Sequence, residues 1–203
     1  MTNEEQQAAA ALAAAGRRFD GRGLAAATSG NYSALVGDAI VVTRSGRHKG
    51  RLETADFMRL ARDGTPIDSG TPSAEGALHV MLYRLFPDAA AVLHWHSPVG
   101  VGLSRAEPAG GWRFAGHEML KAFPGVATHD TARTVPVIDN SQDMAEIEAA
   151  VAPLLDAVDV APAFMIRSHG LYGWGRDVAE AERVAEAVEW LLQAELAERS
   201  FRA

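Results

Sequence analysis

Hydrophobic residues in this chain follow two different spacings, and the order of those spacings limits the folds that the chain can adopt. Short apolar runs of strand length occur at AIVVT, AAVLHWH and AFMI. Apolar residues recur with helical spacing over residues 73–85 and again over residues 177–200. These segments do not alternate regularly, as repeated β-α-β units would. We therefore expect an α/β (α+β-like) fold, with a central, mostly antiparallel sheet flanked by helices on both faces.

The remaining elements are predicted from caps, turns and glycines. Thr2 followed by Glu5 resembles a capping box and predicts a helix to about Gly16, with a second short helix over residues 17–25. TSGNYSAL and AIVVT flank a Gly-Asp turn and predict a hairpin. Further elements are expected as a strand in DFMRLARDGTPI, a short helix from Pro98, a helical turn over 118–123, a strand in RTVPVI and a helix over 144–158. The chain shows no internal repeat and no linker, so residues 1–203 are predicted to form one domain.

Composition excludes several classes of function. Nineteen Lys and Arg against 26 Asp and Glu give a formal charge of −7, which argues against broad nucleic-acid binding. The chain has no cysteine, so disulfides and thiolate metal sites are impossible, and any metal must be held by His, Asp or Glu. The N-terminus has no basic run, and no segment approaches the ~20 apolar residues of a membrane span. We expect a cytoplasmic protein that does not bind membranes.

The stretch LHWHS places two histidines one residue apart in an apolar run. Residues i and i+2 of a strand point to the same face, so His94 and His96 are expected side by side. Two neutral imidazoles with parallel directions can bind one cation, although a core-packing role is the alternative. His169 follows the apolar run AFMI and precedes a glycine, which places it at another strand end. Three such nitrogens would leave coordination positions open, as catalytic metal sites do.

A cupin barrel is a competing scheme, because cupins also use a His-x-His pair. A cupin needs a glutamate a few residues after the pair and a chain made of strands. In this sequence SPVGVG follows the pair and long helices flank it, so we reject the cupin alternative.

Two glutamates and several short polar loops complete the set of candidate site residues. Glu118 opens a helical turn in GHEMLK, and Glu75 lies at the start of a helix in PSAEGALH. Either carboxylate could act as a general acid/base beside a metal, or could be a helix N-terminal charge. Donors for an anion such as phosphate are offered at Ser29-Gly30-Asn31, Ser45-Gly46, Lys49 and Ser73, although short Ser/Gly turns are also ordinary loops.

Several segments, in order and over nearly the whole chain, resemble the class II aldolase/adducin-like family. These are TSGNYS, VVTRSG, PSAEGALHVMLYR, AVLHWHS and SHGLYGWG. The resemblance implies a mostly antiparallel sheet flanked by helices and a homotetramer with sites near subunit interfaces. It also implies one divalent metal per subunit, commonly zinc, held by His94, His96 and His169. The family's phosphate pocket falls on Gly30, Asn31, Ser45, Gly46 and Ser73.

Three further segments, GHEMLKAF, VPVIDNSQDM and RSHGLYGWG, are similar to one dehydratase branch of this family. The resemblance implies loss of water from 5-methylthioribulose 1-phosphate in methionine salvage, through a metal-stabilised enediolate. In that branch the acid/base glutamate falls on Glu118, whereas in the aldolases it falls on Glu75, and this chain carries both. The alternatives are a class II sugar-phosphate aldolase or epimerase and, more remotely, a non-catalytic adducin-like binding domain.

Overall fold

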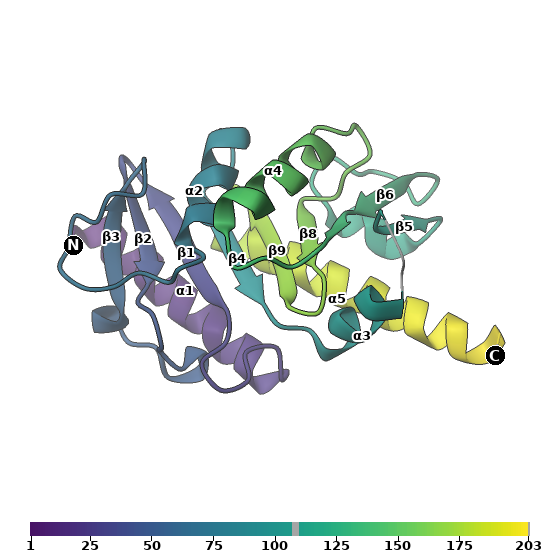
Figure 1. The fold of residues 1–203 in the computed structure, drawn as a ribbon, viewed down its shortest axis with the longest axis horizontal. Helices are drawn as coiled ribbons and strands as arrows, with labels where there is room; N and C mark the ends of the chain where they lie inside the picture. Colours follow the sequence, from purple (N-terminus) through teal and green to yellow (C-terminus); the bar gives the residue numbers. More distant parts are fainter. Residues whose placement is uncertain (107–109, 203) are drawn as a thin grey trace. The chain divides into compact units, whose positions relative to one another are not determined.

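The computed structural model describes residues 1–106 and 110–202. The chain divides into two compact units, which are described separately. The first comprises Met1–His96 and Trp174–Glu182, and the second comprises Ser97–Gly173 and Arg183–Ala203. Strands and helices are mixed in both (Figure 1). The pairs β1–β2, β1–β4, β2–β3, β5–β6 and β8–β9 are antiparallel, and the pair β7–β8 is parallel. The predicted α/β class with a mostly antiparallel sheet is confirmed.

The first unit begins with helix α1 (Asn3–Gly21). Its capping box is formed as predicted, because Thr2 Oγ1 accepts a hydrogen bond from Glu5 N–H and Glu5 Oε2 accepts one from Thr2 N–H. The expected break near Gly16 and the separate second helix over residues 17–25 are wrong, since α1 continues past Gly16 and ends at Gly21. A Cβ atom at Gly16 would lie 2.4 Å from the Lys49 carbonyl oxygen. Glycine at this position therefore permits close packing and does not end the helix.

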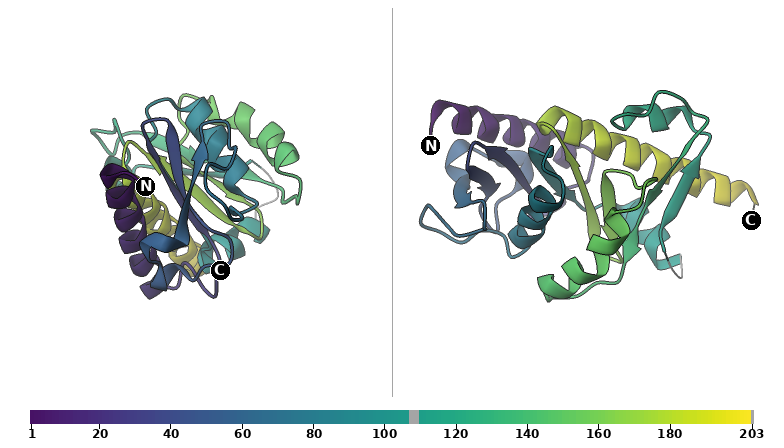
Figure 2. Two further views of the ribbon diagram at one scale, coloured as in Figure 1. Left: turned by 90° about the vertical axis from the view of Figure 1, so that its left-hand side faces the viewer. Right: turned by 90° about the horizontal axis from the view of Figure 1, so that it is seen from above.

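Four antiparallel strands form the sheet of the first unit, in the order β3 (Phe57–Ala61), β2 (Ala39–Thr43), β1 (Asn31–Val36) and β4 (Ala91–Trp95). Ala90 N–H donates to Gly175 O, so the end of β9 (Gly170–Gly175) continues the sheet beyond β4. Helices α1 and α2 (Gly76–Leu85) lie on opposite faces of these strands (Figure 2). The short 3₁₀ helices are η1 (Lys49–Arg51) and η2 (Thr54–Asp56).

The core of the first unit lies between α1 and the sheet. The Phe19 ring makes edge-to-face contacts with Tyr32 and Trp95, at centroid distances of 5.8 and 6.0 Å. All three side chains are almost completely buried. Trp95 thus points toward the core, as strand alternation predicts for the residue between two histidines.

The second unit contains a parallel pair, β7 (Val137–Ile138) beside β8 (Ala163–Ile166), and the antiparallel pair β8–β9. Strands β5 (Trp112–Ala115) and β6 (Ala132–Val135) form a separate two-stranded sheet. The predicted continuous strand RTVPVI is therefore wrong. It divides at Pro136, which has no N–H to donate; the residues before it pair with β5 and those after it with β8.

The remaining helices are α3 (Pro98–Ala106), η3 (Glu118–Ala122), α4 (Met144–Leu155) and α5 (Val178–Arg202). In α5 the residues of the predicted stripe are fully buried: Ala181, Val184, Ala185, Val188, Leu191 and Leu192. Helix α2 begins three residues later than expected, so Ser73 belongs to the preceding turn, where its carbonyl accepts a hydrogen bond from Gly76 N–H. Within the described chain, no helix combines the length and apolar character that a membrane crossing requires.

Candidate metal centre and anion-binding loops

Strand β4 places its two histidines side by side, as the alternation predicts. His94 is fully buried and His96 follows directly after the last strand residue. Their Nε2 atoms lie 3.1 Å apart. With metal–nitrogen distances of about 2.0–2.1 Å, that separation corresponds to an angle of roughly 100° at a shared metal. The pair therefore fits two adjacent ligands of one cation.

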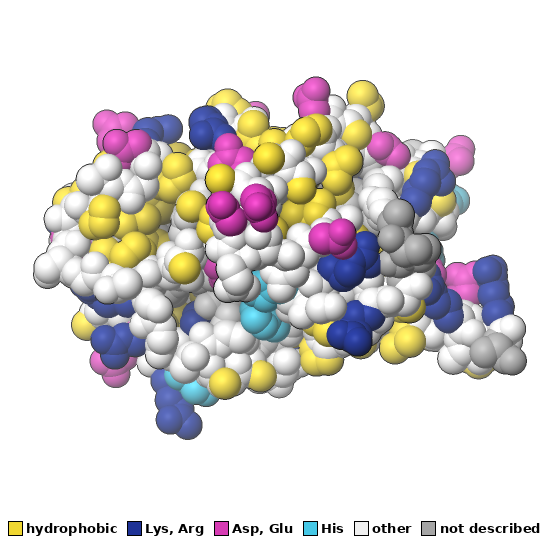
Figure 3. Space-filling view, in the orientation of Figure 1, with side chains coloured by type: hydrophobic (Ala, Val, Ile, Leu, Met, Phe, Trp, Pro, Cys, Tyr) yellow, Lys and Arg dark blue, Asp and Glu magenta, His cyan; other side chains and the backbone are white. Residues whose placement is uncertain are grey.

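His169 lies in the second unit, in the turn that connects β8 to β9. Its N–H donates to Ile166 O at 3.0 Å, and Ser168 before it has a positive φ of 60°. The ring is half-buried. The ring of His169 offers one nitrogen donor in the second unit, as the rings of His94 and His96 do in the first. Histidine atoms reach the molecular surface in Figure 3. A donor set of three imidazoles is suited to zinc and to several other divalent transition metals.

Glu75 lies beside the strand-borne histidines. Its Oε2 atom is 3.4 Å from His94 Nε2 and accepts a hydrogen bond from Asn31 Nδ2 at 2.5 Å. The backbone supports this contact, because Asn31 and His94 are directly paired across β1 and β4. Glu75 occupies the N-cap position of α2 but makes no side-chain cap hydrogen bond. Its carboxylate is therefore directed toward His94 and not toward the helix N-terminus.

Glu118 has a different setting, at the start of η3 in the second unit. Its side chain is 67% exposed and forms ion pairs with Lys121 and with His129 Nδ1, the latter at 3.0 Å. The hydrogen bond from Lys121, assisted by the positive charges of Lys121 and His129, lowers the pKa of Glu118. Glu118 is consequently an ionised carboxylate over a wider pH range than an ordinary glutamate.

The candidate anion-binding residues lie in three loops of the first unit. Gly30 immediately precedes β1, where a Cβ atom would lie 2.5 Å from the His94 carbonyl oxygen. Its φ is +79°, so both the close approach of the His94 carbonyl and the backbone conformation require glycine. Ser45 and Gly46 are exposed, and Ser45 N–H donates to Thr71 O, close to Ser73 in the third loop. Asn31 Oδ1 and Ser29 Oγ are buried atoms without a hydrogen-bond partner among the described residues.

Lys49 joins two of these loops from inside the protein. Its side chain is buried, and Nζ donates to the carbonyl oxygens of Thr28 and Arg47, both at 2.7 Å. Burial lowers the pKa of Lys49 to about 8, although the charge of Glu75 opposes this shift. Buried ammonium groups are rare in proteins unless they are paired. The Lys49 ammonium joins the loop that contains Thr28 to the loop that contains Arg47 through the carbonyl groups of these two residues.

Sequence reasoning missed a buried cluster behind β1 and the residues that hold the His169 turn. Ser33 Oγ lies 2.7 Å from both His79 Nδ1 and Tyr83 Oη, and burial lowers the pKa of His79 to about 4. In the second unit, Ser104 hydrogen bonds to Arg167 and Ser168. Because more than sixty residues separate Ser104 from these partners, no local spacing could have indicated the contact.

Comparison with known proteins identifies a matching protein family and a set of similar dehydratases. A family model described as Class II Aldolase and Adducin N-terminal domain matches residues 10–196. A methylthioribulose-1-phosphate dehydratase from Acidiphilium cryptum is 46% identical over 94% of this chain and 90% of its own length. A dehydratase of the same name from Methylococcus capsulatus is 45% identical over 95% of this chain and 94% of its own.

Solved structures agree on the fold. YgbL from Escherichia coli, described as a putative aldolase/epimerase/decarboxylase, superposes with a TM-score of 0.80 at 25% identity, covering 95% of this chain and 89% of that one. The l-fuculose-1-phosphate aldolase from Thermus thermophilus gives a TM-score of 0.76 at 25% identity, covering 96% of this chain and 95% of that one. The predicted family resemblance is thus confirmed at the levels of both sequence and fold.

Proposed function

The chain belongs to the Class II Aldolase and Adducin N-terminal domain family, and we propose that it dehydrates 5-methylthioribulose 1-phosphate to 2,3-diketo-5-methylthiopentyl 1-phosphate and water. One observation carries this proposal. The relatives that share nearly half of their residues with this chain, over nearly its whole length, are dehydratases of that substrate. The aldolase of known structure shares only a quarter.

His94, His96 and His169 are the proposed ligands of one divalent cation per subunit, and zinc is the proposed metal. The support is the family to which the chain belongs and the 3.1 Å separation of the His94 and His96 Nε2 atoms. When bound, such a cation supplies a Lewis acid, which polarises a carbonyl and favours loss of the adjacent C–H proton. The chain has no cysteine, so it offers no thiolate ligand. Its remaining soft donors are the sulfur of methionine and the neutral imidazole of histidine.

Glu118 is the proposed general base. It would take the proton from C3, between the carbonyl carbon and the carbon that loses its hydroxyl group. A base must be unprotonated, and the lowered pKa of Glu118 keeps its carboxylate in that form. Loss of the C4 hydroxyl as water from the resulting enediolate requires one proton. The enol that remains then takes up a proton at C4, loses the proton of its C3 hydroxyl and becomes the diketone.

Glu75 is proposed as the second catalytic carboxyl group: in its protonated form it would deliver its proton to the departing C4 hydroxyl and become a carboxylate. Its Oε2 atom accepts a hydrogen bond from Asn31 and lies 3.4 Å from a proposed ligand nitrogen. Such a fixed position suits a group that must act at one defined oxygen. The two carboxylates would thus divide the two proton transfers of the elimination.

The phosphate of the substrate is proposed to bind Gly30, Asn31, Ser45, Gly46, Lys49 and Ser73. Three observations support this assignment: a buried ammonium group, exposed glycine-containing turns and buried polar atoms of Ser29 and Asn31 without protein partners among the described residues. Backbone N–H groups in such turns, combined with one charge, are typical of phosphate sites.

A class II sugar-phosphate aldolase or epimerase is the second candidate function. The specific observation in its favour is that Glu75, the acid/base position implied by resemblance to the aldolases, contacts His94. The same enediolate would then break or form a C–C bond instead of losing water. A non-catalytic binding domain of the adducin type is the third and remotest candidate.

Incubation of the purified, zinc-loaded protein with 5-methylthioribulose 1-phosphate tests these candidates directly. We expect the diketone phosphate and one equivalent of water, with no aldehyde fragment. Aldehyde cleavage products would overturn the dehydratase in favour of the aldolase. A protein that remains metal-free after dialysis against zinc would instead favour the binding domain.

The proposal extends to the setting of the enzyme. We place the reaction in methionine salvage, in the cytoplasm, with a homotetramer as the active form and its sites near subunit interfaces. Support comes from the family and from the dehydratases that resemble this chain. Neither nucleic acids nor membranes are proposed as partners. Light scattering of the purified protein checks the tetramer, and a monomer of full activity would contradict it.

A further inference from the structure

The turn that carries His169 is tight and holds an unfavourable backbone conformation. Strands β8 and β9 pair up to Ile166 and Gly170, so only three residues connect them. Ser168 in this turn has φ at +60°, a left-handed conformation that is unfavourable for a residue with a side chain. A turn of this kind persists only where its surroundings fix it.

Ser104, on the last turn of α3, provides one part of this fixation. Its Oγ atom accepts a hydrogen bond from Ser168 N–H at 3.0 Å, and the same hydroxyl donates to Val101 O at 2.8 Å. Its carbonyl oxygen accepts a hydrogen bond from Arg167 Nη1. Ser104 is fully buried. One residue of α3 therefore contacts both residues that precede His169.

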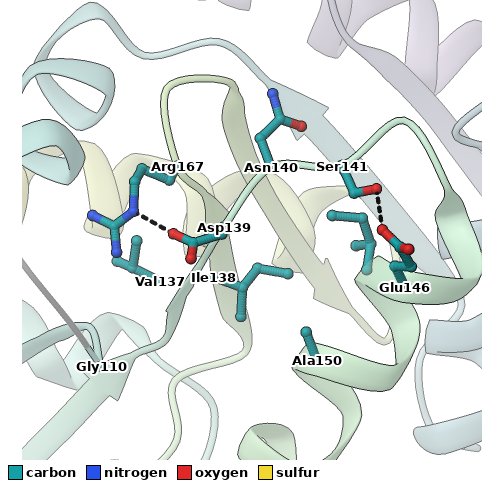
Figure 4. Close-up of a pocket in the computed structure, with 10 residues that line it drawn as sticks. Gly110, Val137, Ile138, Asp139, Asn140, Ser141, Glu146, Ala150 and Arg167 are labelled. Atoms are coloured by element: carbon teal, nitrogen blue, oxygen red, sulfur yellow. Dashed lines mark hydrogen bonds and ion pairs between the residues drawn. The ribbon is translucent and has the colours of Figure 1, made fainter.

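Arg167 extends the same network to β7. Its backbone N–H donates to Ile138 O at 2.8 Å, and its Nε atom donates to Asp139 Oδ1 at 2.7 Å. Figure 4 shows Arg167 and Asp139 facing one another at the edge of a cavity of about 400 Å³ in the second unit. Asp139 is 88% exposed, and an ion pair so open to solvent adds little stability. The directional contacts of the Arg167 guanidinium matter more for the geometry of the turn than for the stability of the fold.

We propose that Ser104 and Arg167 are positioning residues for the metal site: they hold the β8–β9 turn so that His169 is oriented before metal binds. This inference rests on the proposed role of His169 as a ligand. A ligand on a loosely held turn would have to be ordered at the moment of binding, and that loss of entropy would weaken the affinity. Residues that orient metal ligands from behind typically contribute about 10- to 100-fold to metal affinity.

The test compares zinc affinities of the full-length protein by competition with a chromophoric chelator. Wild type, Ser104→Ala and Arg167→Met are measured beside Asp143→Ala, a matched control in the same unit. Asp143 Oδ1 caps α4 by accepting the Ala145 N–H, so its loss is expected to weaken that helix without touching the β8–β9 turn. We expect zinc affinity about 10- to 100-fold weaker in Ser104→Ala and Arg167→Met, and unchanged in Asp143→Ala.

A second measurement separates positioning from general destabilisation. In the metal-free proteins, amide hydrogen exchange at Ser168 and His169 is expected to accelerate in Ser104→Ala but not in Asp143→Ala. Wild-type zinc affinity in both Ser104→Ala and Arg167→Met would overturn the inference and leave the proposed function intact. A wild-type protein that takes up no zinc would overturn the metal site itself. If Ser104→Ala fails to fold, Arg167→Met decides the question alone.

Discussion

Glu75 and Glu118 are both glutamates at the start of a helical segment, yet their surroundings differ. Glu75 is 20% exposed, hydrogen bonds to Asn31 and lies 3.4 Å from His94 Nε2. Glu118 is 67% exposed and its partners are the charged or ionisable groups of Lys121 and His129. The pairing of β1 with β4, which carries His94, also fixes the position of the Glu75 carboxylate through Asn31. The pKa of Glu118 is instead lowered by side chains at the surface.

The position of the Glu75 carboxylate and the protonation state of Glu118 are therefore controlled in different ways. The register of β1 against β4 fixes Glu75 through Asn31, so its placement depends on backbone geometry. Lys121 and His129 lower the pKa of Glu118, so its ionisation depends on neighbouring charges. We therefore expect substitutions near Glu75 to affect metal and substrate binding, and substitutions near Glu118 to affect catalytic rate and its pH dependence.

Replacement of Glu118 is expected to give the largest effect. Glu118→Gln removes the proposed base and should lower kcat by about 10²- to 10⁴-fold, with zinc content unchanged. The measurement is steady-state kinetics on 5-methylthioribulose 1-phosphate together with metal analysis. Glu4→Gln, on the exposed face of α1, is the control. Full activity in Glu118→Gln would remove this residue from the mechanism.

Glu75→Gln is expected to have a smaller but broader effect. Loss of the negative charge beside His94 should weaken zinc affinity by about tenfold and lower kcat by about 10- to 100-fold. Chelator competition and kinetics on fully zinc-loaded protein separate the two contributions. A larger loss of kcat in Glu75→Gln than in Glu118→Gln would reverse the assignment and favour the acid/base position of the aldolases.

Lys49→Met tests the loops next to Glu75. Loss of the ammonium should raise KM by about 10- to 100-fold through loss of a charge-assisted interaction with phosphate, with less change in kcat. In the wild type the ammonium is charged below its pKa of about 8 and loses its proton above it. KM should therefore rise as the pH increases through about 8, and this rise should be absent in Lys49→Met. A KM that is independent of pH in the wild type would exclude Lys49 from phosphate binding.

Lys121→Met is expected to give the smallest effect. Lys121 lowers the pKa of Glu118, so its removal should raise that pKa toward the ordinary value. The acid limb of the pH profile of kcat/KM should then move to higher pH, whereas kcat on the alkaline side should stay nearly constant. An unchanged acid limb would show that Glu118 is not the group whose ionisation the rate reports.

Local rules predicted much of the fold and part of the site. The capping box of α1, the hairpin of β1 and β2, and the buried stripe of α5 all formed where caps, turns and periodicity indicated. The errors occurred where a contact from elsewhere overrode a local signal. Gly16 looked like a helix end, but it permits close approach of the Lys49 carbonyl. RTVPVI looked like one strand, but its two halves pair with different partners.

By itself, the sequence determined the chemistry that is available: no thiolate, and two imidazoles that strand alternation directs to the same face. Only the tertiary structure decided that Glu75 meets His94, that Lys49 is buried between two loop carbonyls, and that Ser104 holds the His169 turn. The physical reason is the range of the interactions. The period of a strand is set by its own backbone, whereas these contacts, apart from the one between Lys49 and Arg47, join residues far apart in the chain and depend on sheet register and helix packing.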